Sequence, residues 1–208
     1  MATRKYVQRL RADAAEQTRR RILDAVYERL RTAPAERVSL DQVARIAGVA
    51  RSTVYLIFGS RAGLFEAIGV DLLQHGGFDE LMRAVTDPDA REALRGSIHA
   101  STRMYATNRD LLRALHSMAL LDPEAYGGAI ARMEDGRAAG MAHHARRLAE
   151  QDALLPGLSR DDAAHLLCLL TSFDSFDALH TGRSLPVTEV ADLLLAAAER
   201  GICRPGRG

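Results

Sequence analysis

The sequence has little that would suit a secreted, disulfide-bonded or membrane-spanning protein. Its 208 residues include no Trp, only 5% aromatic residues and two cysteines, Cys168 and Cys203. Two distant cysteines form neither a disulfide framework nor a zinc cluster, and Cys168 in an apolar segment is interpreted as a small buried hydrophobe. No apolar run approaches the ~18–20 residues of a membrane span, and the first ten residues are too basic for a signal-peptide core. We therefore expect a soluble, cytoplasmic chain with no membrane contact.

The chain is instead rich in Ala and Leu, and hydrophobic residues make up 47% of it. This fraction is enough for a core and excludes disorder of the whole chain. The shortage of aromatic residues, together with the abundance of Ala and Leu, favours helices packed on helices over a β-sandwich. We therefore predict an all-α chain of one domain or two small ones.

Charge is unevenly distributed along the chain, although the net charge is only +1. Residues 1–65 carry 13 Lys and Arg against 6 Asp and Glu, whereas residues 66–208 carry 15 against 21. A basic N-terminal third on an acidic body is expected of a nucleic-acid-binding module joined to a second domain. An ordinary solvated, Arg-rich surface would give the same balance. All but one of the basic residues are Arg, which suits bidentate contacts.

Apolar periodicity and capping signals divide the chain into about nine helices. Ile22, Val26 and Leu30 recur at helical spacing in the first main helix, which Pro34 should end near Thr32. Gly residues at 48, 182 and 201 are expected to end later helices. The expected helix starts are Ser39 with Gln42, Asp87 before Pro88, Asp122 before Pro123, and Ser159 with Asp162.

Residues 39–58 fit a helix-turn-helix on physical grounds. Ala44 supplies the small residue where two short helices approach, and Gly48 supplies the sharp reversal between them. The apolar wedge between the helices would consist of Val43, Ala47, Val49, Val54 and Phe58. Polar side chains are left on the outer face of the second helix, where they could reach base edges or phosphates. The alternative is a helical hairpin that merely packs.

The same segment carries the motif residues of a known family. They are Ala47-Gly48-Val49, Thr53-Val54-Tyr55, Phe58, Ser60-Arg61 and Leu64. In this pattern the chain resembles the N-terminal domain of TetR-family transcriptional regulators. With the preceding helix, the resemblance covers roughly residues 16–75. It implies a basic arm over 1–15, a helix-turn-helix domain over 16–60 and a ligand-binding and dimerisation domain over 61–208.

The resemblance also implies that the helix from Arg51 enters the major groove of double-stranded DNA. Arg51 would read bases by bidentate contact with guanine, and Arg61 would hold a phosphate. The ring of Tyr55 could equally complete the domain core, with only its hydroxyl reaching DNA. The residues expected to contact DNA are Ser39, Arg51, Ser52, Thr53, Tyr55 and Arg61.

Three positions depart from the family pattern. Ala50 stands where a Ser or Thr often caps the recognition helix, so that cap should be missing. Leu56 and Ile57 occupy positions that are usually polar or aromatic, so fewer phosphate contacts are expected there.

The remainder of the chain lacks a catalytic signature. It has no Gly-rich phosphate loop, no Gly-x-Ser-x-Gly and no His-Glu-x-x-His, so we expect no enzyme, no cofactor and no metal. A metal site built from His99, His116, His144 and His165 is a minor alternative. The resemblance implies a small-molecule effector site and a homodimer interface here.

Helical spacing supplies candidates for both sites, although each residue could also be plain core. The effector candidates are Ile98, Tyr105, Met133, Arg137, Met141, His144, Phe173 and Asp177. The dimer candidates are Leu166, Leu170, Phe176, Val190, Leu194, Ala197 and Ala198, whose alanines would allow close helix approach.

Our leading hypothesis is a ligand-responsive repressor that binds a near-palindromic operator as a dimer. A regulator that answers to a protein partner is the second hypothesis. A helical enzyme or small-molecule carrier is the third.

Overall fold

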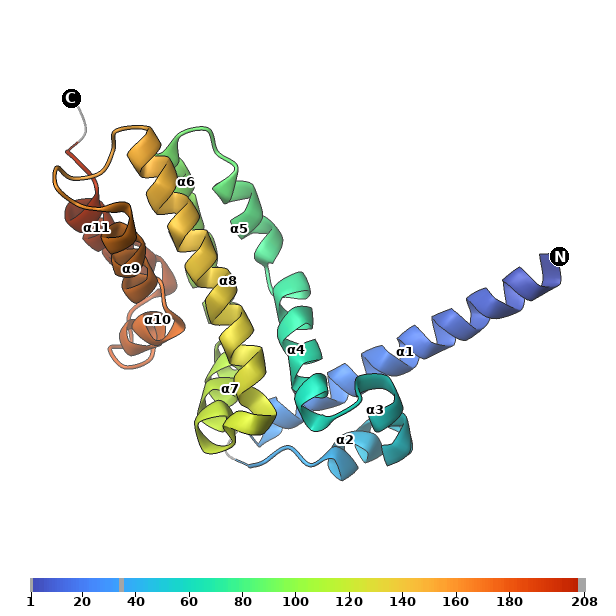
Figure 1. Ribbon diagram of the computed structural model, residues 1–208. Coiled ribbons are helices and arrows are strands. Elements are labelled where there is room, and N and C mark those ends of the chain that lie inside the picture. Colours follow the sequence, from blue (N-terminus) through green and yellow to red (C-terminus); the bar gives the residue numbers. More distant parts are fainter. Residues whose placement is uncertain (1, 34–35, 206–208) are drawn as a thin grey trace. The chain divides into compact units, whose positions relative to one another are not determined.

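All regular structure in the described part of the chain is α-helical, which confirms the predicted all-α fold (Figure 1). The computed structural model describes residues 2–33 and 36–205. One isolated antiparallel bridge joins Leu154 and Cys203. The eleven helices of these residues are α1 (Ala2–Thr32), α2 (Leu40–Ala47), α3 (Arg51–Phe58), α4 (Arg61–His75), α5 (Phe78–Val85), α6 (Ala90–Thr107), α7 (Arg109–Leu121), α8 (Pro123–Glu150), α9 (Arg160–Leu170), α10 (Phe173–His180) and α11 (Val187–Ile202).

The count exceeds the predicted nine for two reasons. The short helix α5 lies between Gly77 and Thr86, a segment for which the sequence analysis predicted no helix of its own. The helix expected to run through residues 159–182 is two helices, because Ser172 caps a new start by accepting a hydrogen bond from the Ser175 backbone N–H (3.0 Å). The segment 1–15, predicted as a basic arm, belongs to the continuous helix α1 from Ala2 onward.

Most predicted helix ends are confirmed. Gly48 ends α2 with a left-handed backbone (φ 64°), and Ser159 caps α9 by accepting from the Asp162 N–H. Asp122 likewise accepts from the Ala125 N–H (3.2 Å) at the start of α8. Two predictions are wrong. Asp89, not Asp87, is the N-cap of α6, and its side chain accepts from the backbone N–H groups of Arg91 and Glu92. The last helix, α11, runs past Gly201 to Ile202.

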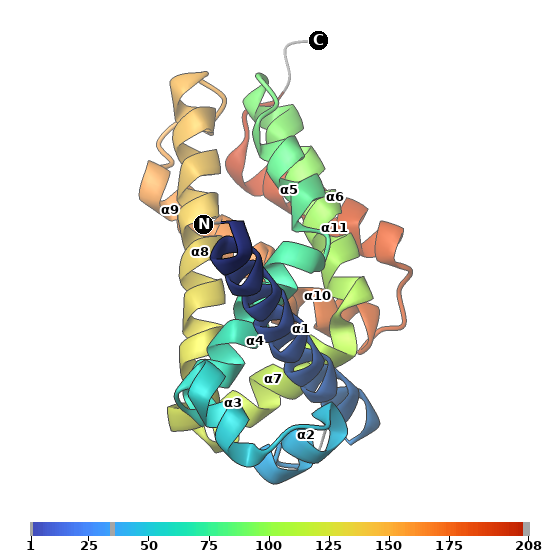
Figure 2. The same ribbon diagram turned by 90° about the vertical axis from the view of Figure 1, so that its right-hand side faces the viewer.

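The contacts within the chain define two compact units, which we call unit 1 (Met1–Val70 and Arg113–Ile130) and unit 2 (Asp71–Leu112 and Ala131–Gly208). In unit 1, α2 packs on α1 and α3 packs on α2 (Figure 2). The predicted stripe of Ile22, Val26 and Leu30 is fully buried there, each side chain being 0% exposed. Removing three such side chains from water stabilises the folded chain by several kcal/mol. This stripe therefore determines which face of α1 is covered by α2.

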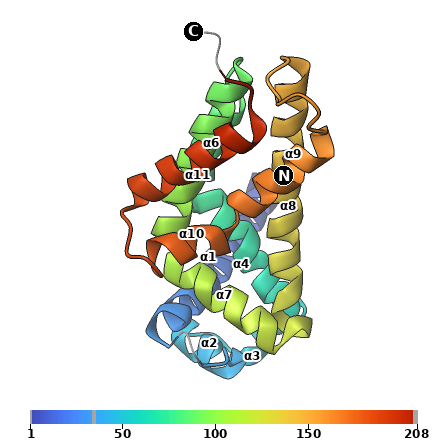
Figure 3. The same cartoon turned by 90° about the vertical axis from the view of Figure 1, so that its left-hand side faces the viewer.

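Unit 2 is organised around α6 and α11. Helix α6 packs against α5. Helix α11 packs against α6, α9 and α10 (Figure 3). Arg147 of α8 donates to the carbonyl oxygens of Val85 (2.8 Å) and Pro88 (2.9 Å), and so binds the loop between α5 and α6. Within the described residues, no helix is long and apolar enough to cross a membrane.

Candidate nucleic-acid interface and effector site

Helices α2 and α3 form a helix-turn-helix with a short, defined turn. Gly48 adopts φ 64° and ψ 39°, a conformation that costs a residue with a side chain more than it costs glycine. The next backbone N–H, of Val49, donates to the carbonyl oxygen of Ala44 (2.9 Å) and closes the turn. Ala50 then precedes α3 without a side-chain cap, as the sequence predicted.

The predicted wedge between the helices is largely buried. Val43 is 0% and Val54 is 1% exposed, and Ala44 and Ala47 are buried beside them. Val49 and Phe58 are half-buried. Phe58 also carries the guanidinium of Arg19 over its ring, 5.1 Å from the centroid, so α1 covers this edge of the motif with a cation–π contact.

The opposite face of α3 carries most of the residues predicted to contact DNA. Arg51, Ser52 and Tyr55 are exposed, and Thr53 is half-buried. Tyr55 is 41% exposed, so it is not part of the core. This face also exposes Leu56, which the sequence analysis did not place among the contact residues.

Arg51 is held by two neighbours in the free protein. Its Nη1 donates to Asp41 Oδ2 (3.2 Å), and its Nη2 donates to the Tyr55 hydroxyl (3.3 Å). The hydrogen bond with Tyr55 and the charge of Asp41 both raise the pKa of Arg51. The side chains of Arg51 and Asp41 are 55% and 58% exposed, so this is a solvent-screened pair that a stronger partner can replace.

Ser39 stands at the N-cap of α2, but the predicted capping box is absent. The Ser39 side chain makes no cap hydrogen bond. Gln42, its expected partner, instead accepts from Arg29 Nε (3.3 Å). Arg29 is only 6% exposed and also binds Glu36 Oε2 (2.5 Å), so the guanidinium joins α1, α2 and the segment between them.

Arg61, the predicted phosphate contact at the start of α4, is bound within unit 1. Its Nη1 donates to Asp122 Oδ2 (3.3 Å), and its Nη2 donates to the Tyr126 hydroxyl. The guanidinium lies 4.9 Å from the centroid of the Tyr126 ring. The side chain is 29% exposed, so part of it faces solvent while Asp122 and Tyr126 hold the rest. Sequence reasoning missed both partners.

These features define a helix-turn-helix protein whose motif presents polar side chains outward. The sequence of residues 22–68 matches the model of a family described as bacterial regulatory proteins, tetR family. This match confirms the resemblance of the N-terminal helix-turn-helix segment to the TetR family of transcriptional regulators. No curated protein matches the sequence significantly.

Solved structures share the fold over nearly the whole chain. NalD, the secondary repressor of the MexAB-OprM multidrug efflux pump of Pseudomonas aeruginosa, has a TM-score of 0.69 at 24% identity, with 93% of this chain and 100% of that chain covered. SmeT, the repressor of the SmeDEF multidrug efflux pump of Stenotrophomonas maltophilia, has a TM-score of 0.68 at 20% identity, with 91% and 94% covered. A SmeT–triclosan complex has a TM-score of 0.65 at 19% identity, with 91% and 93% covered.

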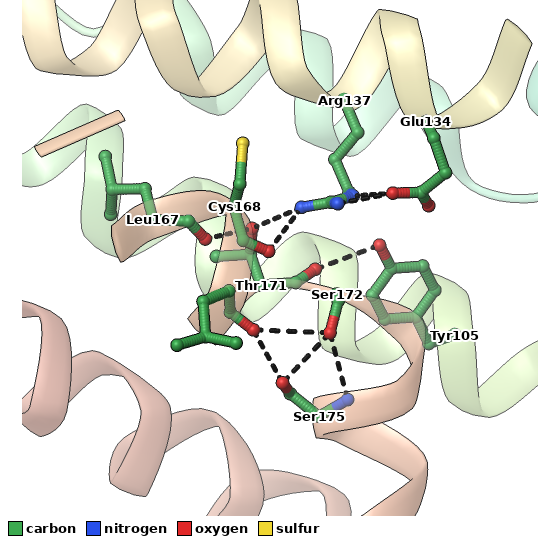
Figure 4. A network of polar contacts seen from close by, with 9 residues as sticks. Tyr105, Glu134, Arg137, Leu167, Cys168, Thr171, Ser172 and Ser175 are labelled. Atoms are coloured by element: carbon green, nitrogen blue, oxygen red, sulfur yellow. Dashed lines mark hydrogen bonds and ion pairs between the residues drawn. The ribbon is translucent and has the colours of Figure 1, made fainter. Parts of the chain in front are cut away.

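Several predicted effector residues come together in unit 2 around Thr171 (Figure 4). The Tyr105 hydroxyl donates to the Thr171 carbonyl oxygen (3.1 Å), and Arg137 Nη1 donates to the Cys168 carbonyl oxygen (2.7 Å). Arg137 also pairs with Glu134. The Tyr105 ring meets the Phe173 ring edge-on, with centroids 5.7 Å apart. Arg137 therefore satisfies the carbonyl group of Cys168 near the C-terminal end of α9, where the chain breaks before α10.

The other effector candidates have different surroundings. Asp177 accepts from Arg109 Nε (2.8 Å) and from the Thr181 hydroxyl (2.6 Å), which are partners that the sequence did not reveal. Ile98 and Met141 are buried, and Met133 is half-buried. His144 is 1% exposed, and neither ring nitrogen has a hydrogen-bond partner in the described residues. The described residues contain no group of three or more His, Cys, Asp and Glu side chains that could hold a metal ion.

We expect His144 to make stability depend on pH. Burial, followed by the charges of His143 and Arg147, lowers the pKa of His144 from 6.5 to about 4. Because the unfolded chain takes up a proton near pH 6.5 and the folded chain does not, stability is lost as the pH falls from 6.5 towards 4. The loss should reach roughly 2 kcal/mol at pH 4.5.

Chemical denaturation of His144→Leu between pH 7 and pH 4.5 measures this contribution. Between pH 7 and pH 4.5, His144→Leu should lose roughly 2 kcal/mol less stability than the wild type loses. The control is His165→Gln, which removes a histidine that is exposed on α9 and should lose as much stability as the wild type over this interval. Parallel pH profiles for wild type and His144→Leu would contradict a buried, neutral imidazole.

The dimer candidates divide into buried and exposed sets. Phe176, Val190, Leu194 and Ala198 are at most 5% exposed and pack inside the chain. Leu170 is half-buried, whereas Leu166 and Ala197 are exposed. Two further leucines on the same helices, Leu169 and Leu193, are 66% and 51% exposed. The exposed apolar residues of α9 and α11 are thus Leu166, Leu169, Leu193 and Ala197, which we call the α9–α11 face.

Proposed function

We propose that the chain is a ligand-responsive transcriptional repressor that binds near-palindromic double-stranded DNA as a homodimer. The proposal rests chiefly on the outward face of α3, where Arg51, Ser52 and Tyr55 are exposed on a helix-turn-helix of a regulator family. Such donors can reach base edges in a major groove, which is wide enough to admit a helix. The site of action is the bacterial chromosome in the cytoplasm.

The residues divide by the DNA group that each can reach. Arg51 and Ser52 would read base edges, because both project from the exposed first turn of α3. Thr53 and Tyr55 would donate to phosphates from the same helix. Ser39 has a hydroxyl that caps nothing in α2 and would serve a phosphate at that helix N-terminus. Arg61 would reach a phosphate by exchanging Asp122 for it.

Asp41 competes with DNA for Arg51, so Asp41→Asn should bind DNA more tightly than the wild type. The substitution frees the guanidinium and removes a negative charge from the DNA-facing surface. We expect a gain of about two- to five-fold in affinity, as suits an exposed ion pair. Fluorescence anisotropy with a labelled duplex measures it. Asp161→Asn, in the first turn of α9, changes net charge equally and should leave the affinity unaltered; an equal gain in both variants would contradict the competition.

A dimer would form through the α9–α11 face. Exposed leucines and an alanine on two packed helices suit a four-helix bundle across a two-fold axis. Light scattering at micromolar concentration should give the mass of two chains, with and without DNA. A monomer mass in both conditions would overturn this part of the proposal.

The effector would be a small molecule bound among α6, α8 and α10. NalD and SmeT are repressors of multidrug efflux pumps, and SmeT has been solved with triclosan. By analogy, the ligand would be a largely apolar molecule that meets Tyr105, Phe173 and the unpartnered ring nitrogens of His144. Triclosan is therefore the first probe to titrate.

Helix α4 is the proposed link between effector and DNA. It is one continuous helix that begins at Arg61 and runs to His75. A displacement of α4 would spoil the spacing of the paired recognition helices, which must match one DNA turn of ~34 Å. Coupling of this kind is reciprocal, so DNA must weaken effector binding by the same factor. Equal triclosan affinity with and without operator would favour regulation by a protein partner.

Retention on DNA-cellulose at low salt separates the regulator from the remaining alternative. A helical enzyme or small-molecule carrier predicts no retention, whereas the proposed regulator must be retained and must elute as salt rises.

A further inference from the structure

We propose that Leu56 reads the 5-methyl group of a thymine in each half-site of the operator. This inference rests on the proposed DNA-binding function and adds a specificity-determining residue to it. The observation behind it is an apolar side chain standing in solvent on the polar face of α3. Leu56 is 87% exposed, the highest value among the large apolar side chains of the described residues.

The fold does not use Leu56. The other apolar residues of α3 face the motif core, with Val54 1% exposed and Ile57 and Phe58 half-buried. Leu56 instead lies one turn after Ser52, and both side chains are exposed on the same side of the helix. The leucine thus belongs to the surface from which the motif would contact DNA.

The chemistry of the major groove limits what such a side chain can recognise. Base edges there present hydrogen-bond donors, acceptors and one apolar group, the methyl of thymine. The leucine side chain has neither a hydrogen-bond donor nor an acceptor. Placing it against a phosphate would remove water from a charged group without supplying a hydrogen bond in its place. Contact with the thymine methyl buries apolar area on both partners, so this is the base feature that Leu56 favours.

The spacing along α3 places the thymine within the half-site. Leu56 follows Ser52 by four residues, which is about 6 Å along a helix that rises 1.5 Å per residue. Successive bases on one strand lie about 3.4 Å apart. The thymine should therefore lie about two base steps from the base that faces Ser52.

Removal of single methyl groups from the DNA tests the inference. A binding duplex is first selected from random sequence, and each thymine of one half-site is then replaced in turn by deoxyuridine, which keeps base pairing and loses only the methyl. Affinities for wild type and Leu56→Ala are measured by anisotropy. For the wild type, one replacement should weaken binding about four-fold, the value of one buried methyl-sized group. Replacement in both half-sites should weaken it about 15-fold.

Leu56→Ala should bind the thymine and deoxyuridine duplexes equally. The matched control is Leu120→Ala at the end of α7, which removes another highly exposed leucine (86%) and should keep the wild-type discrimination. Leu56→Met should keep part of the discrimination between the thymine and deoxyuridine duplexes. A methyl effect that persists in Leu56→Ala, or one that is absent from the wild type, overturns the inference while leaving DNA binding intact. Failure of the wild type to select any DNA overturns the proposed function, and the inference with it.

Discussion

Arg51→Ala is expected to weaken binding to the cognate duplex by about 5- to 150-fold for each half-site, and to relax base preference at one position. The reason is that Arg51 is the exposed side chain of α3 that can form two parallel hydrogen bonds to one base. Its present partners, Asp41 and the Tyr55 hydroxyl, are screened by solvent and can be exchanged. Binding of the variant to cognate and scrambled duplexes over a range of salt concentrations gives both the loss of affinity and the change in base preference.

Arg61→Ala is the informative comparison for Arg51→Ala. If Arg61 leaves Asp122 for a phosphate, its removal should weaken all sequences alike and lower the slope of log affinity against log salt by about one unit. Arg183→Ala, in the loop after α10, controls for the loss of one positive charge. Identical profiles for Arg51→Ala and Arg61→Ala would contradict the division between base reading and phosphate binding.

Phe65→Ala is expected to destabilise the protein by about 3–5 kcal/mol. Phe65 is 0% exposed and meets the Tyr126 ring at 4.2 Å between centroids, so α4 and the start of α8 share this contact within unit 1. Removing the ring leaves a cavity that the neighbouring helices can fill only in part. Urea unfolding followed by circular dichroism measures the change.

Phe65→Leu is the control, because it keeps most of the apolar volume and should cost less than half as much. A loss below about 1 kcal/mol for Phe65→Ala would contradict the packing of this core.

The parts of the fold that could be predicted from sequence are those set by local signals. Ser159 and Gly48 marked helix ends because a hydroxyl acceptor and a left-handed glycine act within a few residues. The break between α9 and α10 was missed for lack of a glycine or proline, although Ser172 and Ser175 carried the signal. Helix α5 was missed because no capping side chain marks its start: its N-cap is Gly77, which offers no side-chain hydrogen bond.

The apolar stripe of Val190, Leu194 and Ala198 on α11 could be predicted from its spacing, but the sequence could not tell whether this stripe packs inside the chain or against a second copy. Leu194 is buried, and only packing against α6 and α9 decides that the stripe lies inside the chain. The same limit applies to the DNA-facing surface. Its outward residues followed from motif spacing, but Asp122 is 61 positions from Arg61, and no local signal pairs residues at such a separation.

Selection of bound fragments from random double-stranded DNA tests the central claim most directly. The account predicts enrichment of one near-palindromic sequence whose half-site centres lie about 10–10.5 base pairs apart, or a multiple of that spacing, because two α3 helices related by a two-fold axis must enter successive major grooves. Recovery of no enriched sequence, or of one without two-fold symmetry, would contradict it.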